Sequence, residues 1–121
     1  MKESGSDHPI TIEKNPHRIR VVLGGFIVAE TTESLTLREA SLPPVHYIPR
    51  DHVRMDLLEP TDRRTRCPYK GEASYFTVTA GGLVRENAAW SYEQPKPAVG
   101  AIAGHIAFYP EKVDDIEEFR D

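Results

Sequence analysis

Two glycine pairs, each set between two runs of strand-forming residues, restrict the folds open to this chain most strongly. A two-residue connection between antiparallel strands requires positive φ at its centre, which glycine adopts at little steric cost. Each pair therefore predicts a β-hairpin. The predicted arms are residues 18–23 and 26–30 around Gly24-Gly25, and residues 73–79 and 83–92 around Gly81-Gly82.

Shorter segments complete a chain in which helix is scarce. Residues 34–39 alternate apolar and polar side chains, and residues 45–48 and 105–109 are short β-like runs. The best helical segment is 97–103, with proline in its first turn and glycine just past its end. About seven short strands with one or two short helices predict a mainly β fold. We expect antiparallel sheets in a partly open barrel or a sandwich.

Length and charge distribution predict one domain with polar ends. The 121 residues suit a single core. The net charge of −4 arises entirely in residues 111–121, which hold six acids and two bases, so residues 1–110 are neutral overall. We therefore expect a flexible N-terminus over 1–8, a β-rich domain over 9–114 and an acidic tail over 115–121.

Several classes of protein are disfavoured. The first residues lack the apolar core of a signal peptide, and the longest apolar run, 21–29, is far shorter than the roughly 20 residues of a membrane span. We expect a cytoplasmic protein that binds no membrane. The neutral body argues against nucleic-acid binding. No phosphate-binding glycine loop, dinucleotide motif or His-Glu-x-x-His is present, so no cofactor is identified.

The single cysteine lies in the most reactive part of the chain. One thiol excludes an internal disulfide and a zinc site with several thiolates, and the histidines at 46, 52 and 105 have no regular ligand spacing, so no metal is predicted. Residues 63–71 contain four cations and no acid around Cys67. If Arg66 and Lys70 lie near the sulfur, they would lower the pKa of the thiol, and they could instead bind a phosphate or carboxylate. Alternatively, Cys67 is a small buried apolar residue.

Five blocks occur together and in order, among them Thr-x-Cys-Pro-x-Lys-Gly-x-Ala-x-Tyr, Trp-x-Tyr and Gly-x-x-Ala-Phe-Tyr. The blocks are residues 37–39, 44–53, 65–75, 89–92 and 102–110. Over residues 17–114 the chain resembles the bacterial domain of unknown function 427 family, sometimes labelled nucleotidyltransferase-like. The resemblance implies a small β domain of the Mss4-like kind and no particular reaction. The resemblance identifies the following residues of this chain as motif positions, without assigning them roles: Glu39, Tyr47, Asp51, Cys67, Lys70, Tyr75, Trp90 and Tyr92.

Our preferred hypothesis is a small-molecule site, with or without catalysis. Cys67 would be the nucleophile, and Glu39 or Asp51 would transfer protons. An anionic ligand would contact the remaining site residues, which are Arg66, Lys70, Tyr47, Tyr75, Trp90 and Tyr92. Two of these assignments have plainer alternatives, since aspartate at position 51 is also a good cap for a turn after Pro49, and Trp90 is also a good core residue.

The competing hypothesis is a non-catalytic binding or scaffold module. In it the proline-rich centre is a rigid loop, and the acidic tail contacts a partner. The arginine cluster pairs with nearby carboxylates, which are Glu59, Asp62 and Glu72. Exposed sheet edges would also allow a homodimer. A nucleotidyltransferase normally needs convergent carboxylates for its metal, and the chain has no Asp-x-Asp pair.

Overall fold

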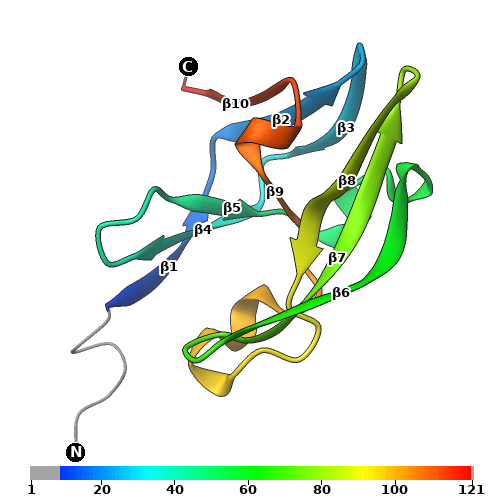
Figure 1. The fold of residues 1–121 in the computed structure, drawn as a ribbon. Coiled ribbons are helices and arrows are strands. Elements are labelled where there is room, and N and C mark those ends of the chain that lie inside the picture. Colours follow the sequence, from blue (N-terminus) through cyan, green and yellow to red (C-terminus); the bar gives the residue numbers. More distant parts are fainter. Residues whose placement is uncertain (1–8, 121) are drawn as a thin grey trace, which may run out of the picture.

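The computed structural model describes residues 9–120, so the flexible segment predicted over 1–8 lies outside the described residues. The mainly β prediction is confirmed. Ten strands form three antiparallel sheets with no closed barrel in this part of the chain, and its only helices are 3-10 turns (Figure 1). None of those described turns has the length or hydropathy to cross a membrane.

The strands divide among the sheets as follows. The first sheet has the order β1-β4-β5, from β1 (Ile10–Asn15), β4 (Ser34–Glu39) and β5 (Val45–Tyr47). The second has the order β10-β2-β3, from β10 (Asp115–Phe119), β2 (Arg18–Leu23) and β3 (Phe26–Thr31). The third has the order β6-β7-β8-β9, from β6 (Leu58–Cys67), β7 (Gly71–Ala80), β8 (Leu83–Ser91) and β9 (Ala107–Phe108). The 3-10 turns are η1 (Arg50–His52), η2 (Met55–Leu57), η3 (Pro97–Ile102) and η4 (Pro110–Lys112).

Both predicted hairpins are present, and their turns contact each other. β2 and β3 flank Gly24-Gly25, and β7 and β8 flank Gly81-Gly82, with positive φ at all four glycines. A Cβ at Gly81 would lie 2.1 Å from the Gly24 carbonyl oxygen, and one at Gly24 would lie 2.4 Å from the Ala80 carbonyl oxygen. The two tips lie side by side in Figure 1 because neither position carries a side chain.

Two hydrophobic clusters join the sheets. The outer faces of the sheets meet solvent, while the buried side chains pack between them. The larger cluster joins the second and third sheets and includes Ile19, Val21, Leu23, Val28, Phe76, Val78, Ala89 and Phe108. The smaller cluster joins the first sheet to the third and to η3, and includes Leu37, Tyr47, Ala73, Tyr75, Tyr92, Val99, Ile102 and Ala107. We call this smaller cluster the inner cluster.

Three strands, β1, β6 and β10, are absent from the predicted set. β6 covers the charged centre of the chain and pairs with β7, so this segment is a strand rather than a rigid loop. Residues 115–119, within the predicted acidic tail, form β10. β10 pairs with β2 from Asp115 opposite Val22 to Phe119 opposite Arg18, and all its residues after Asp115 are partly buried.

The helical predictions need two corrections. The segment predicted as a helix over 97–103 is the 3-10 turn η3, interrupted at Val99, whose φ of −123° and ψ of 28° are not helical. The single turn predicted after Pro49 is present as η1, but the capping role assigned to Asp51 is wrong. Asp51 lies inside η1, and the N-cap is Pro49, which has no side-chain acceptor.

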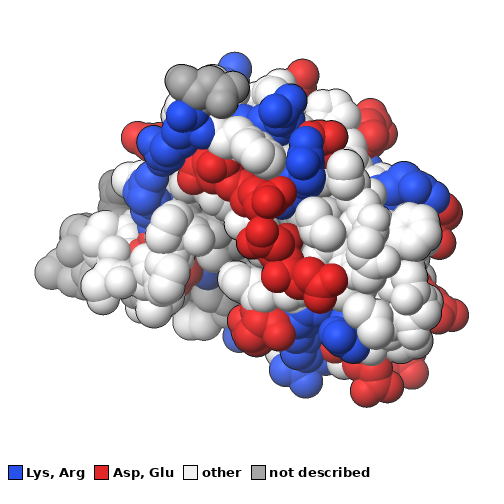
Figure 2. Space-filling model, turned by 90° about the horizontal axis from the view of Figure 1, so that it is seen from above, with Lys and Arg blue, Asp and Glu red and all other residues white. Residues whose placement is uncertain are grey.

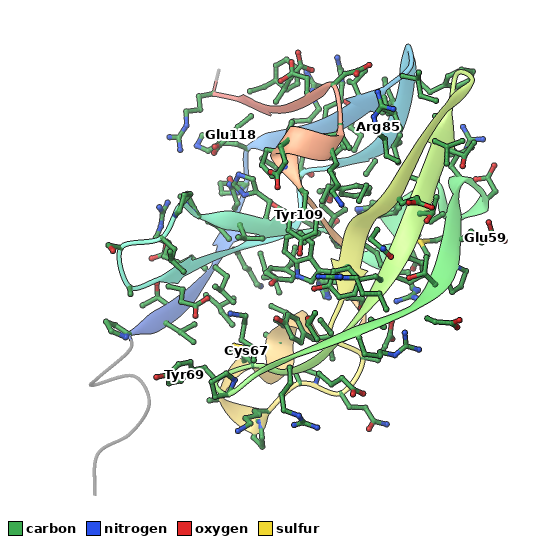
Figure 3. The ribbon with its side chains drawn as sticks, in the orientation of Figure 1. Glu59, Cys67, Tyr69, Arg85, Tyr109 and Glu118 are labelled. Atoms are coloured by element: carbon green, nitrogen blue, oxygen red, sulfur yellow. The ribbon has the colours of Figure 1, made fainter. Side chains whose placement is uncertain are left out.

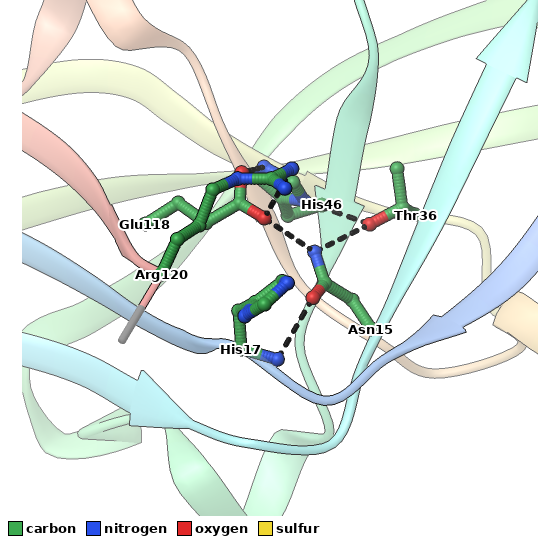
Figure 4. A network of polar contacts seen from close by, with 6 residues as sticks. All are labelled: Asn15, His17, Thr36, His46, Glu118 and Arg120. Atoms are coloured by element: carbon green, nitrogen blue, oxygen red, sulfur yellow. Dashed lines mark hydrogen bonds and ion pairs between the residues drawn. The ribbon is translucent and has the colours of Figure 1, made fainter.

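A polar network connects the first and second sheets near the start of β2 (Figure 4). The Asn15 amide donates to Thr36 Oγ1 at 3.1 Å and to Glu118 Oε2 at 3.2 Å. His46 Nδ1 lies 3.0 Å from the same threonine hydroxyl, and its Nε2 lies 3.9 Å from Glu118 Oε1. Burial lowers the pKa of His46 below its ordinary value of 6.5, against the opposing effect of Glu118, and Arg38 and Arg120 lower it further.

This network predicts a pH dependence of stability. Because the pKa of His46 is lower in the folded state, the unfolded chain binds more protons at and below pH 6.5, so stability falls as the pH decreases through that range. His46→Asn retains a hydrogen-bonding group and removes the titration, so its free energy of unfolding should fall less between pH 7 and pH 5. Urea titrations across this range measure the difference, and the same series on His105→Asn serves as the control. Parallel curves for wild type and His46→Asn would contradict the prediction.

The contact between the turns predicts unequal costs for two neighbouring substitutions. Gly82→Ala places a Cβ in open space at positive φ and should destabilise the fold by about 1 kcal/mol. Gly81→Ala adds a clash with the Gly24 backbone and should cost about 3 kcal/mol. Urea unfolding of the two variants measures the difference. Equal losses would show that the turns separate without cost.

Candidate functional site

An ion pair between Lys70 and Glu39 lies at the edge of the inner cluster. Lys70 Nζ donates to Glu39 Oε1 at 2.5 Å, and the two side chains are only 10% and 13% exposed. Glu39 ends β4 in the first sheet, and Lys70 lies in the turn that joins β6 to β7 in the third. The pair therefore connects two sheets. It also places a proton donor and a proton acceptor together in a largely buried position.

The turn that carries Lys70 is held from both sides. Cys67 and Gly71 are opposed in the register of β6 and β7, and Gly71 has a φ of +113°, which favours glycine. The backbone amide of Lys96 donates to the carbonyl oxygen of Lys70 at 2.9 Å. These constraints fix the backbone from which the lysine reaches Glu39.

Two buried tyrosines flank the ion pair. Tyr47 and Tyr92 are 1% and 6% exposed, and Lys70 Nζ lies 6.0 Å from the centre of the Tyr92 ring. Burial raises the pKa of both hydroxyls well above the ordinary value, and the nearby Glu39 raises each further. Both therefore stay protonated at neutral pH. Tyr47 accepts a hydrogen bond from Trp90 Nε1 at 3.3 Å and keeps its own hydroxyl hydrogen as a donor.

Cys67 belongs to the same neighbourhood. It is partly exposed, packs against the inner cluster, and lies close enough to Tyr47 and Tyr92 to affect their ionisation. Figure 3 shows it at the end of β6. Cys67 is thus a partly exposed residue close to the two tyrosines that flank the ion pair.

A second group of hydroxyls lies next to Trp90. The Tyr75 and Tyr109 rings stack at 6.5 Å, and the Tyr109 and Trp90 ring centres are 4.4 Å apart. Burial, with the Tyr75 contact, raises the pKa of Tyr109 to about 12. Tyr75 differs, because hydrogen bonds from Thr65, Tyr109 and Arg63 outweigh the opposing effect of burial and lower its pKa. Tyr75 is therefore the more readily ionised phenol of the stacked pair.

The structure brings together most of the residues expected at the site and separates two. The inner cluster and the ion pair at its edge contain Glu39, Tyr47, Cys67, Lys70, Tyr75, Trp90 and Tyr92. Arg66 instead lines a groove of about 420 Å³ with Arg64 and Lys96. Successive strand residues face opposite ways, so this groove and Cys67 lie on opposite faces of the β6–β7 pair.

Asp51 is the second separated residue. It is exposed on η1, and in the part of the chain that the structure describes no hydrogen bond or ion pair joins it to Glu39 or Lys70. The predicted salt bridges of the arginine cluster are also missing. Within residues 9–120 no ion pair connects those arginines with their expected partners, which were Glu59, Asp62 and Glu72.

Three residues that contact Tyr75 are not among the predicted site residues. Thr65 Oγ1 lies 2.8 Å from the Tyr75 hydroxyl, and the Arg63 guanidinium lies 5.0 Å from the centre of the Tyr75 ring. Tyr109 completes the group. A signal for two of them was available, because Thr65 and Tyr109 occupy fixed positions in the quoted sequence blocks. Among the described residues, no three histidine, cysteine, aspartate or glutamate side chains are placed to hold a metal ion.

The fold and the cluster define a small mainly β domain with a buried polar pair among aromatic side chains. The chain belongs to the family described as domain of unknown function DUF427, whose model matches residues 11–118. The match extends into β10, in agreement with its place in the second sheet. No curated protein matches the chain.

The ion pair predicts strong coupling between its partners. Lys70→Met removes the Lys70 ammonium from the largely buried Glu39 carboxylate, which should cost about 3 kcal/mol. The double variant Glu39→Met/Lys70→Met replaces the pair with apolar side chains. Its free energy of unfolding should lie within about 1 kcal/mol of the wild-type value. Urea unfolding of both single variants and the double variant gives the coupling free energy. Additive losses would show that the two charges act independently.

Proposed function

We propose that this domain binds a small molecule that carries an anionic group, with Lys70 as the cation that receives it. The supporting observation is the Lys70–Glu39 pair itself. An apolar pair of similar volume would stabilise a buried position as well or better, so a charged pair there suggests a role other than stability. In this proposal Glu39 holds the ammonium in place in the unliganded protein and shares it with the ligand.

The surroundings of the pair suggest which ligands suit it. Tyr47 keeps a protonated hydroxyl at neutral pH, and Trp90 lies next to it as a flat apolar surface. A phenyl ester of phosphoric acid combines an anion with a ring, whereas inorganic phosphate supplies the anion alone. We therefore expect aromatic anions to bind more tightly than inorganic ones of the same charge.

Catalysis remains part of the proposal. The Glu39–Lys70 pair can accept or supply a proton, and Cys67 lies near it with partial access to solvent. Alkylation of Cys67 by iodoacetamide, followed by mass spectrometry, tests whether the thiol is available. If the ligand lies against the thiol, phenyl phosphate should slow that alkylation. An unchanged rate at saturating ligand would remove Cys67 from the site.

A second location for an anion has its own observation. Arg64, Arg66 and Lys96 line one groove, and in the described part of the chain none of them forms an ion pair with a carboxylate. The same lining contains Glu72 and Glu93, of which Glu93 pairs with Arg50, so the groove carries a small excess of positive charge that favours phosphate. Variants of Lys70 and Arg66 distinguish the two locations, because they lie on opposite faces of the β6–β7 pair.

Thermal unfolding with phenyl phosphate tests the proposal. Wild type should gain a few degrees in Tm at millimolar ligand, and less with inorganic phosphate. The folded double variant Glu39→Met/Lys70→Met should lose this gain, and Arg66→Gln should keep it. The reverse pattern would assign the anion to the groove, and no gain with either anion would refute anion binding at both places. ATP with magnesium in the same assay tests the nucleotidyltransferase-like alternative.

A further inference from the structure

A cleft of about 620 Å³ lies between the segment before β5 and the C-terminal segment that leads into β10. Its volume lies within the range of small-molecule sites. Its walls are mainly apolar, with Ile48 and Phe108 from the core and Pro43 and Pro44 from the approach to β5. Leu42, at its margin, is 57% exposed, which is unusual for a large aliphatic side chain.

The charged residues that line this cleft are all acidic. They are Glu111, Asp114 and Asp115, and no lysine or arginine is among the described residues of its lining. Figure 2 shows a band of acidic side chains across the end of the molecule where β10 and η4 lie. Asp114 accepts a hydrogen bond from the Gly24 amide, and within residues 9–120 neither Glu111 nor Asp115 forms an ion pair.

The one basic side chain in the lining does not offset these acids. His46 is 82% covered, and burial lowers its pKa, so the imidazole is neutral at pH 7. The potential in the cleft therefore comes from the carboxylates and favours a cation. Among the charged residues of the lining, an anion would meet only carboxylates.

Aromatic rings supply a second, independent preference for a cation. Trp90 and Tyr109 both line the cleft, with ring centres 4.4 Å apart and planes inclined by 39°. The ammonium of Lys112, which is outside the lining, already lies 5.7 Å from the centre of the Tyr109 ring. Aromatic faces attract ammonium groups, and the attraction is strongest where water is partly excluded.

We propose that this cleft binds an organic cation, an ammonium group attached to a compact apolar body. The apolar body packs against the proline and aromatic walls, and the positive charge lies toward the acidic margin and the rings. This site differs from the anion contact proposed at Lys70, because its ligand has the opposite charge and its lining excludes both Lys70 and Glu39, although Trp90 borders both.

Trp90 makes the proposal directly measurable, because it is the only tryptophan in the chain. Titration with benzyltrimethylammonium should change its fluorescence saturably, whereas benzyl alcohol and benzoate, which carry the same ring, should bind at least about tenfold more weakly. Raising the salt concentration from 50 to 500 mM should weaken the binding of benzyltrimethylammonium and leave the binding of benzyl alcohol unchanged. Equal binding of the alcohol, or tighter binding of benzoate, would overturn the proposal, as would the absence of a saturable signal.

Variants at the acidic margin complete the test. The double variant Glu111→Gln/Asp115→Asn changes two exposed residues. It should lower the affinity for benzyltrimethylammonium about threefold to tenfold without changing Tm. Glu59→Gln/Asp62→Asn removes two exposed carboxylates from β6, outside the lining, and serves as the matched control. The double variant Glu39→Met/Lys70→Met should still bind the ammonium, so failure of the anion proposal would leave this result unaffected. Equal weakening in the margin and control variants would reduce the effect to net charge and overturn the site.

Discussion

The contact between two backbone turns determines how the rest of this domain can be arranged. Gly24 and Gly81 approach so closely that neither tolerates a Cβ, and this contact holds the tips of two hairpins from different sheets together. The larger cluster fills the space between the same two sheets. The first sheet packs against the third through the inner cluster.

The inner cluster between the first and third sheets combines aliphatic side chains with aromatic rings. Each tyrosine or tryptophan ring brings a polar atom that requires a partner. Tyr47 meets Trp90, and Tyr75 meets Thr65 and Tyr109. The Lys70–Glu39 pair closes the edge. The cluster thus holds several hydroxyl groups in defined, largely buried positions.

Local signals explain what the sequence could predict. The hairpins were predictable because their glycine pairs leave a pattern. β1, β6 and β10 were not predicted; each is an edge strand of its sheet, as are β3, β5 and β9, which were predicted. An edge strand needs no regular alternation of apolar residues, and in β6 five of the ten residues are charged. Its pairing with β7 is set by the partner and the turn, which are not local properties.

The same reasoning applies to the site. The sequence blocks selected seven residues that gather at the inner cluster, but linear proximity suggested that Arg66 and Lys70 would act together. Strand geometry separates them, because Arg66 lies one residue before Cys67 and therefore on the other face. Asp51 was selected by the blocks as well, and it lies exposed on η1. A motif thus identifies residues, and the strand direction decides which of them meet.

The place of β10 has a consequence for how the chain reaches this structure. Asp115 pairs with Val22, which is 93 positions earlier, whereas the β2–β3 hairpin pairs only with its immediate neighbour. During synthesis the hairpin can form early, but one edge of β2 stays without its partner until residues 115–119 have left the ribosome. Contacts of such long range slow folding, and an open strand edge can pair with other chains. β10 therefore protects a hairpin that is made long before it.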